Sequence, residues 1–330
     1  MNETPEFYEL YQAMKKRGNV QRIAEVSLWC LICFCALLGN SATLLVIAKN
    51  RRLWGSTNML IACLAVFDLS MSVLNGLPFA APSLAIGKWP FSYAACQYMG
   101  YSGIAIAVGS MQTISCIAVN RFYRVVRPTK FKRAFSVRST AVYIVTLWVF
   151  ALIAPLPYIL EDEKFKFQPG KILCFPSSES GLQKGLHFIV LVLIPGTVIC
   201  YCYLRVYLKV RQHMVAVTTS IGAEEIAITK TLVAIVLGYL CCWVPILAID
   251  LVDFFIGRLV MPRWVYLLYG YLAMLSSVTS PVIYALLIPT FRREYLKLIK
   301  KIRKCNRVGN CRVEDSIETT EVCVISSKYM

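Results

Sequence analysis

The clearest carboxylate inside an apolar stretch of this sequence is Asp68, in LAVFDLSMS. An ionised carboxylate is costly in hydrocarbon, so an acid at membrane depth is a functional hypothesis by default. Asn40, Ser110, Ser276 and Ser277 lie at comparable depths in other apolar stretches. Their oxygens could complete a site for a small cation such as Na⁺, or for a proton. The alternative is that Asp68 is a satisfied polar group that only fixes helix packing.

A second polar stretch, IAVNRFYRVVRP at residues 117–128, begins as apolar helix and ends in a series of arginines. Two histidines in the whole chain make no convincing metal site. No nucleophile, acid–base or phosphate-binding pattern points to an enzyme. The chemistry of this chain is therefore to be sought in a few charges and in the apolar segments that carry them.

Those segments are long, and each reaches the roughly 20 residues that a helix needs to cross the hydrocarbon of a bilayer. The chain is 58% hydrophobic, and a soluble core helix would show a polar face in addition. The pattern predicts an all-α membrane protein, a bundle of seven transmembrane helices. The predicted segments are 23–48, 58–84, 93–119, 139–160, 185–209, 228–256 and 264–287.

Basic residues favour one orientation of this bundle. The loops after the first, third and fifth segments, together with the tail through Arg307, hold more Lys and Arg than the opposite side, which predicts a cytoplasmic location for them. We expect an extracellular tail at 1–22, a bundle at 23–290, a membrane-surface helix at 291–305 and a cytoplasmic tail at 306–330. The net charge of +17 then indicates topology and anionic lipid as a neighbour, and not a nucleic-acid partner.

Most of the fourteen cysteines lie within the apolar segments, where they are small buried hydrophobes. Only Cys96, at the outer end of the third segment, and Cys174, between the fourth and fifth, fall on the oxidising side. We predict that these two form a disulfide.

The order of motifs resembles that of the rhodopsin-like (class A) G-protein-coupled receptors. One landmark falls in each segment: Gly39-Asn40, LAVFD ending at Asp68, Cys96 to Asn120-Arg121-Phe122, Trp148, Pro195 with Tyr203, Cys242-Trp243-Val244-Pro245, and Ser280-Pro281-Val282-Ile283-Tyr284. The resemblance covers residues 23 to 305 and implies a plasma-membrane receptor that converts binding of an extracellular ligand into activation of a heterotrimeric G protein.

Within that family the chain resembles the melatonin receptors and related orphan receptors. The likeness rests on Asn120-Arg121, CYLRVYLKVRQ at 202–212, PRWVYLLYGYLA at 262–273 and FRREY at 291–295. It weakens where melatonin receptors have an Asn and a His, because Tyr158 and Leu191 stand there and His187 lies one turn away.

Single residues of the sequence test whether the ligand belongs to other known classes. An opsin carries a lysine for retinal where this chain has Met274, so no retinal is expected. An amine receptor carries an aspartate where this chain has Gly103. A non-retinal opsin-like or peptide receptor is one alternative, and an ion-coupled transporter or channel is the alternative from another class, although no inverted repeat is visible.

The resemblance places a ligand cavity beside Asp250 and Asp253, which are three residues apart and so share a helix face. We expect Asp250 to accept a cationic or hydrogen-bonding group of a small-molecule or peptide ligand, and Asp253 to be the more solvated of the two. The other candidate lining residues are Gly103, Ile104, His187, Ile246, Leu247 and Tyr266. The alternative is simple packing for the apolar members and a hydrogen-bonded interior histidine for His187.

By resemblance, Arg121 holds the resting state and then contacts the G protein, with the Gi/o class favoured. The usual acidic predecessor is replaced by Asn120, so we predict an ion pair between Arg121 and Glu225 instead. The proline bends could be hinges or static kinks. The remaining candidate switch residues are Phe122, Tyr203, Trp243, Pro245, Pro281 and Tyr284.

The chain after Pro289 has the spacing of an amphipathic helix with a basic face, suited to the inner leaflet. Cys305 follows it and is a candidate palmitoylation site, with a free thiol as the alternative. Hydroxyl residues of the acidic tail could serve a receptor kinase and arrestin. Asn2 begins a glycosylation sequon on the outer side.

Overall fold

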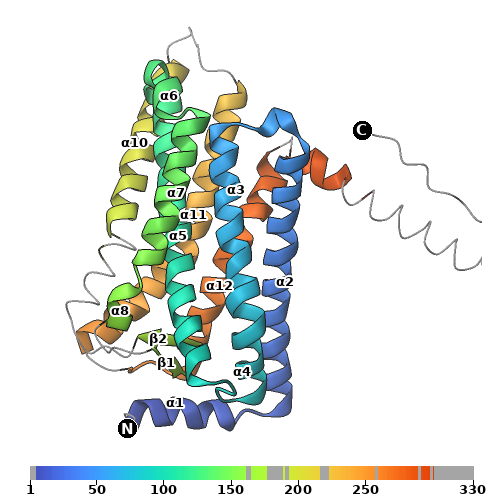
Figure 1. Ribbon diagram of the computed structural model, residues 1–330, viewed down its shortest axis with the longest axis vertical. Helices are drawn as coiled ribbons and strands as arrows, with labels where there is room; N and C mark the ends of the chain where they lie inside the picture. The colour runs from blue at the N-terminus through green and yellow to red at the C-terminus, as the bar shows by residue number, and fades with distance from the viewer. Residues whose placement is uncertain are drawn as a thin grey trace, which may run out of the picture.

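The computed structural model describes residues 5–160, 165–176, 189, 193–215, 223–256, 259–288, 291–297 and 300. Long helices run side by side along the long axis of the molecule (Figure 1). They are α2 (Asn19–Lys49), α3 (Ser56–Met71) continued by η2 (Ser72–Ala80) and α4 (Ala81–Ile86), α5 (Tyr93–Val126), α7 (Val137–Ile153) with α8 (Leu156–Leu160), α10 (Ile194–Val215), α11 (Ala223–Ile256) and α12 (Arg263–Leu287).

The seven predicted segments correspond to these seven helical units. Within the described residues, six of the units are long and apolar enough to cross a membrane. The remaining one, α10, is described only from Ile194, so most of the earlier part of the predicted segment 185–209 lies outside the described residues. The second unit contains Pro78 in η2, where the backbone widens to a π-helix, as proline-disturbed helices do.

The unit α5 is longer than the predicted segment, which ended at residue 119. It begins after Ser92, whose side chain caps the helix by accepting from the Ala95 N–H, and it continues to Val126. It stops where Arg127 precedes Pro128, a position at which helical geometry is disfavoured. Asn120 and Arg121 therefore lie inside a helix and not at its end, because their polar side chains find partners within the bundle.

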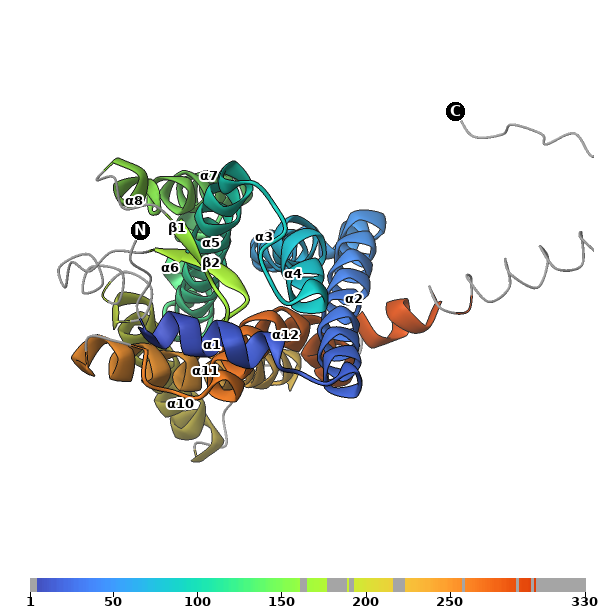
Figure 2. The same ribbon diagram turned by 90° about the horizontal axis from the view of Figure 1, so that it is seen from below.

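Short elements close the two ends of the bundle. At one end, called the α1 end here, α1 (Pro5–Lys15) lies across the helix termini next to the strands β1 (Phe165–Gln168) and β2 (Leu173–Pro176), as Figure 2 shows. The opposite end, called the Arg121 end, has η1 (Arg51–Leu53) and α6 (Pro128–Ala134). The helix α1 falls in the stretch 1–22 that the sequence pattern left as a simple tail.

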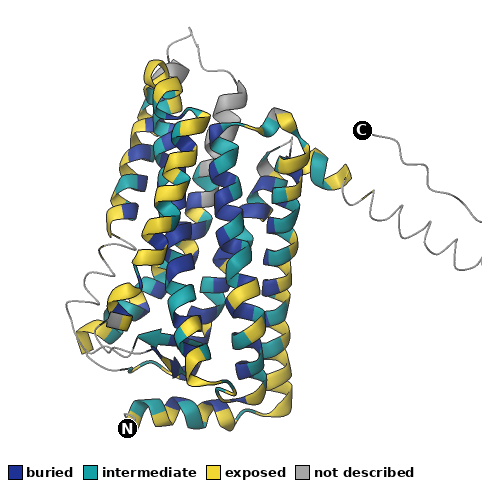
Figure 3. Cartoon of the chain, viewed as in Figure 1, coloured by how far each residue is buried: buried dark blue, intermediate teal, exposed yellow. Residues whose placement is uncertain are grey.

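Buried residues form several clusters along the inside of the bundle, whereas its outer sides expose apolar residues (Figure 3). Two clusters matter for function. The Tyr284 cluster, at the Arg121 end, is built around Ile114, Ile117, Tyr239, Tyr284 and Phe291. The Tyr266 cluster, at the α1 end, consists of Leu10, Ile246, Ile249, Tyr266 and Tyr269. Exposed apolar side chains such as Leu38 and Val149 face outward, as expected of helices in lipid.

Candidate functional site

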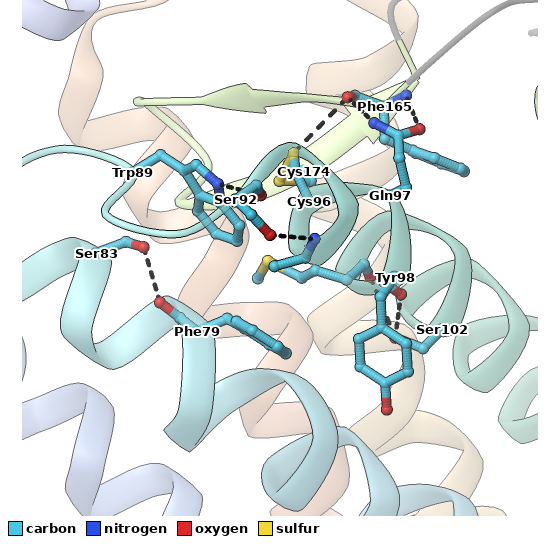
Figure 4. Close-up of a disulfide and its surroundings, with 12 residues drawn as sticks. Phe79, Ser83, Trp89, Ser92, Cys96, Gln97, Tyr98, Ser102, Phe165 and Cys174 are labelled. Atoms are coloured by element: carbon cyan, nitrogen blue, oxygen red, sulfur yellow. Dashed lines mark hydrogen bonds between the residues drawn. A yellow bond between two sulfur atoms is a disulfide. The ribbon is translucent and has the colours of Figure 1, made fainter.

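The predicted disulfide is present at the α1 end. Cys96 of α5 bonds Cys174 of β2, with 5.5 Å between their Cα atoms. The strands β1 and β2 form an antiparallel hairpin. Its first residue is fixed to α5 as well, because the amide of Gln97 donates to the Phe165 carbonyl at 2.7 Å and accepts from the Phe165 N–H at 3.0 Å (Figure 4). The hairpin is thus held firmly to α5.

The acidic pair of α11 faces a lysine that the sequence pattern did not single out. Nζ of Lys171, in the hairpin turn, lies 2.7 Å from Oδ1 of Asp250 and 4.0 Å from Oδ2 of Asp253. The hydroxyl of Tyr269 donates to Asp250 at 3.0 Å, and that of Tyr266 donates to Asp253 at 2.5 Å. These contacts join the hairpin, α11 and α12 at one point.

The expectation that Asp253 is the more solvated acid is wrong. Its side chain is 13% exposed, against 37% for Asp250. The reason is its hydrogen bond with Tyr266, a residue that is itself fully buried.

The structure brings together only part of the predicted ligand set. Ile246 and Tyr266 meet in the Tyr266 cluster beside Asp250. Ile104 instead packs among groups that contain Phe67 and Tyr158, apart from that cluster. A Cβ on Gly103 would meet no heavy atom within 4 Å, so this position borders open space. Leu247 is half-buried, and His187 lies outside the described residues.

A second ionic group at the α1 end escaped the sequence analysis. Glu25 of α2 accepts two hydrogen bonds from Arg263 of α12, at 2.7 and 2.9 Å, and one from Arg17 at 2.6 Å. Arg17 also donates to the Leu84 carbonyl at 2.8 Å. Burial lowers the pKa of the Arg17 guanidinium, and the bond with Glu25 opposes that effect. No sequence motif marks the group, because Glu25 and Arg263 lie 238 residues apart.

The predicted polar group around Asp68 does converge inside the bundle. Asp68 is 1% exposed and hydrogen-bonds with Ser277 and Ser110. Nδ2 of Asn40 donates to the Ser277 carbonyl at 2.9 Å. Within the described residues, Oδ2 of Asp68 and Oδ1 of Asn40 are buried without a hydrogen-bond partner. Ser276 is buried nearby, but its hydroxyl donates to the Ala273 carbonyl at 2.7 Å.

At the opposite end, Arg121 is 1% exposed and donates to the hydroxyl of Thr57 on α3. The same hydroxyl donates to Oδ1 of Asn120 at 2.9 Å. Thr57 is therefore the residue that connects the two members of the motif, and the sequence analysis missed it. The predicted partner, Glu225, belongs to α11, but its side chain lies outside the described part of the chain.

The remaining switch candidates gather at the Tyr284 cluster. Phe122, Tyr203 and Trp243 pack against it, and the Tyr203 hydroxyl interacts electrostatically with Arg121. Trp243 stacks on Tyr239 with 5.6 Å between the ring centres. Trp243 also packs against the Tyr266 cluster. The one ring thus touches both clusters.

The helices α2 and α12 approach each other closely beside these residues. A Cβ on Gly39 would lie 2.7 Å from Cγ of Pro281, so only glycine fits there. Pro245 lies inside α11 and Pro281 inside α12. The proline of α12 is therefore both a break in the backbone hydrogen bonding and a packing contact.

The predicted membrane-surface helix begins as expected, with residues 291–297 helical. Its first residue, Phe291, is buried against Tyr284, and the Tyr295 hydroxyl lies 2.7 Å from that of Thr43 on α2. Cys305 and Asn2 lie outside the described residues. The start of this helix is thus fixed to the bundle.

An apolar cavity of about 450 Å³ lies between α5 and α10. It contains Phe122 but none of the predicted ligand residues, and its Tyr201 is exposed on the outward side of the bundle. We therefore regard it as a membrane-facing groove.

Comparison with known proteins agrees with this arrangement. The family described as 7 transmembrane receptor (rhodopsin family) matches residues 39–284. Melatonin receptor type 1A of Mus musculus is 27% identical over 271 residues, covering 80% of this chain and 76% of that protein. Somatostatin receptor type 5 of Bos taurus is 28% identical over 304 residues, covering 89% and 79%. The resemblance to class A receptors, and to melatonin receptors among them, is confirmed.

The fold is shared as well. The crystal structure of squid rhodopsin superposes with a TM-score of 0.76 at 23% identity, covering 92% of this chain and 91% of that one. The chain therefore belongs to the rhodopsin family of seven-transmembrane receptors, multi-pass proteins of the plasma membrane that transduce ligand binding into activation of a G protein.

Proposed function

We propose that the α1 end is extracellular and that the activating ligand binds there against α11 and α12, with Asp250 as its main polar contact. The Arg121 end is then cytoplasmic and binds the G protein, with the Gi/o class favoured by the relatives. The chain acts as a receptor and not as an enzyme. The excess of basic residues in the loops at the Arg121 end supports this orientation.

The observation that carries the proposal is the position of Trp243. Its ring packs against the Tyr266 cluster, which adjoins Asp250, and against the Tyr284 cluster, which adjoins Arg121. Pro245 lies two residues further along the same helix. A ligand that displaces α11 at Asp250 therefore moves a ring that both clusters contact. Ligand binding can bias a two-state bundle through such a shared element.

Arg121 supports the second half of the proposal. Its side chain is almost fully buried and bound to Thr57, so the G protein reaches it only after the helices move. The arrangement described here is then the resting state. The ligand need only favour the open state by a few kcal/mol to shift the population.

The ligand carries a cationic or hydrogen-bonding group that Asp250 can accept. Melatonin fits less well than the likeness to its receptors suggests, because Tyr158 is buried against Phe165 and is occupied in packing the hairpin. The test is a G-protein activation panel, first without ligand and then with indoleamines, small amines and peptides.

Two variants give that panel its controls. Asp250→Asn should abolish the response to an agonist that the panel identifies, and Ile104→Ala, which lies in a different packing group, should keep it. An unchanged response in Asp250→Asn would contradict the role of this acid. Failure of every G protein to respond would contradict the proposed coupling.

A Na⁺ site at Asp68 fits the same receptor. The residues suit the ion, because Asp68 and Asn40 each have a buried oxygen that could coordinate it and hydroxyl groups lie beside them. Bound Na⁺ would neutralise a carboxylate at membrane depth. We expect NaCl, but not N-methylglucamine chloride, to raise the melting temperature of the purified receptor, and Asp68→Asn to remove the difference.

The features beyond the bundle complete the proposal. The helix that begins at Phe291 lies on the cytoplasmic leaflet, where anionic lipid and palmitoylated Cys305 would hold it. Asn2 is glycosylated outside the cell, and the phosphorylated tail binds arrestin. Mass spectrometry of the receptor from a mammalian cell line tests the two modifications directly.

A further inference from the structure

Lys171 lies in a site built for a cation. The residue is 3% exposed although it belongs to a loop between two helices. Its ammonium makes the 2.7 Å contact with Asp250 and lies over the rings of Tyr269, Phe175 and Tyr266, at 4.2, 4.5 and 5.8 Å from the ring centres. Acidic groups combined with aromatic faces are the usual surroundings of a bound ammonium ligand.

The hairpin turn approaches α12 because two positions lack a side chain. A Cβ on Gly170 would lie 2.8 Å from Cβ of Tyr266, and a Cβ on Gly270 would lie 2.9 Å from the Lys171 carbonyl oxygen. Larger residues at either position would push the turn away from α12. The insertion of Lys171 therefore depends on the close approach of backbone to helix.

The next residue, Ile172, adopts an unfavourable backbone conformation. Ile172 has φ of 59°, in the left-handed region that β-branched residues avoid, and its N–H closes the turn by donating to the Gln168 carbonyl at 2.9 Å. This conformation buries the Ile172 side chain completely. Such a strained residue persists only where the surrounding contacts over-determine it. Here the disulfide, the Ile172 packing and the Lys171 ion pair do so together.

We propose that Lys171 is an internal ligand that occupies the cation site of the receptor, and that an external cationic ligand binds by displacing it. The proposal rests on the proposed role of Asp250 in ligand binding. It names the ligand class as a primary or similarly compact ammonium, since the site already holds one of this shape. The hairpin of β1 and β2 is then a competitor for the site that it covers.

The direction of the effect follows from the other end of the bundle. Lys171 is seated in the same arrangement in which Arg121 is buried and bound to Thr57. A contact that the active state loses stabilises the resting state, so removing it shifts the population toward the active one. Lys171 therefore restrains signalling until a ligand replaces it.

The first test measures ligand-independent G-protein activation at equal surface amounts of receptor. Lys171→Met keeps the apolar stem but loses the charge, and should raise basal activation about fivefold or more. Lys171→Arg keeps the charge and should stay near the original protein. Unchanged or lower basal activation in Lys171→Met overturns the restraining role.

The second test measures binding without any G protein. Purified Lys171→Ala receptor, in which the ammonium is missing, is heated with n-butylammonium chloride or with n-butanol as the neutral control. The amine should raise its melting temperature by about 2 °C or more, and the alcohol should not. The original protein and the double variant Lys171→Ala with Asp250→Asn should show no such rise.

These outcomes separate the inference from the proposed function. A rise with the amine that needs Asp250 supports the internal ligand even if no G protein responds. An equal effect of amine and alcohol, or an effect that persists in the double variant, overturns it. Gly170→Ala gives an independent check, because it should push the turn away from Tyr266 and make the receptor responsive to the amine with Lys171 still present.

Discussion

The two ends of the bundle hold their charges in different ways. At the α1 end, charges meet opposite charges: Lys171 with Asp250, and Arg17 and Arg263 with Glu25. At membrane depth and at the Arg121 end, hydroxyl groups contact the charges. Thr57 contacts Arg121, and Ser110 and Ser277 contact Asp68.

This difference gives the two regions different roles: ion pairs keep the α1 end closed, whereas the polar group around Asp68 can still respond to an ion. Ion pairs that are buried or partly buried cost more to break than exposed ones, so the α1 end is held shut by contacts between loops and helices. Hydroxyl contacts stabilise a charge without neutralising it, which leaves room at Asp68 for an ion to contribute the opposite charge. The following predictions test this contrast, in order of expected effect.

The largest effect should come from the covalent link at the α1 end. Cys174→Ser releases the hairpin from α5, and the disulfide closes a chain separation of 78 residues. We expect a loss of about 4 kcal/mol in the free energy of unfolding and little receptor at the cell surface. Thermal unfolding and surface labelling measure both. Cys241→Ser, an exposed free cysteine, is the matched control and should behave as the original protein.

The ionic group at Glu25 should come next. Glu25→Gln leaves the guanidinium groups of Arg17 and Arg263 buried beside each other without their carboxylate. A loss of about 3 kcal/mol is expected, because the remaining charges are desolvated and uncompensated. Gln21→Ala removes only a 2.9 Å hydrogen bond to the same carboxylate and should cost far less. Equal melting temperatures for the two variants would show that the α1 end is not held by charge.

A smaller effect on stability, but a visible one on signalling, should follow at the Arg121 end. Thr57→Val keeps the shape of the side chain and removes the hydroxyl that joins Arg121 to Asn120. We expect a loss of about 1 kcal/mol and a basal G-protein activation raised about fivefold. Thr146→Val, on the exposed face of α7, serves as the control. Basal activation that does not change would remove Thr57 from the switch.

The smallest effect is expected where an ion pair is exposed. Lys297 and Glu294 are 2.7 Å apart, but their side chains are 71% and 29% exposed. Glu294→Gln should change the free energy of unfolding by less than about 0.5 kcal/mol. A larger loss of free energy of unfolding that disappears in 1 M salt would contradict this expectation. It would mean that exposed ion pairs also stabilise the protein appreciably.

The seven helices and the disulfide could be predicted because each depends on a local or countable property. Apolar length determines which segments can span the bilayer, and only two cysteines fall on the side predicted to be oxidising. The motif residues can be recognised in the sequence as easily: Asp68 and Arg121 stand out because a charge is rare in an apolar segment. Their positions needed no knowledge of contacts.

The partners of these residues could not be predicted in the same way. Thr57 lies 64 residues from Arg121, and Lys171 lies 79 residues from Asp250. Neither pairing leaves a pattern in a single sequence, because each depends on how helices pack or on the path of a loop. The length of α5 was underestimated for a related reason. The apolar pattern ends before Asn120 and Arg121, whereas the helix continues because both side chains hydrogen-bond inside the bundle.

One missed element did leave a signal. Phe7, Leu10, Tyr11 and Met14 follow the spacing of an amphipathic helix, and α1 buries two of them, Leu10 and Met14. The shortness of the stretch and its charged neighbours hid the pattern. A search for helical periodicity outside the membrane segments would have found it.

This small helix also bears on how quickly a ligand can bind. Leu10 packs within the Tyr266 cluster, and the hairpin with Lys171 lies beside it. A ligand that enters at the α1 end, as proposed, would therefore meet two covers in succession. Association rates fall when a protein must first rearrange. A screen with brief exposure would therefore underrate slow ligands, and long incubation followed by washing would reveal them by their equally slow release.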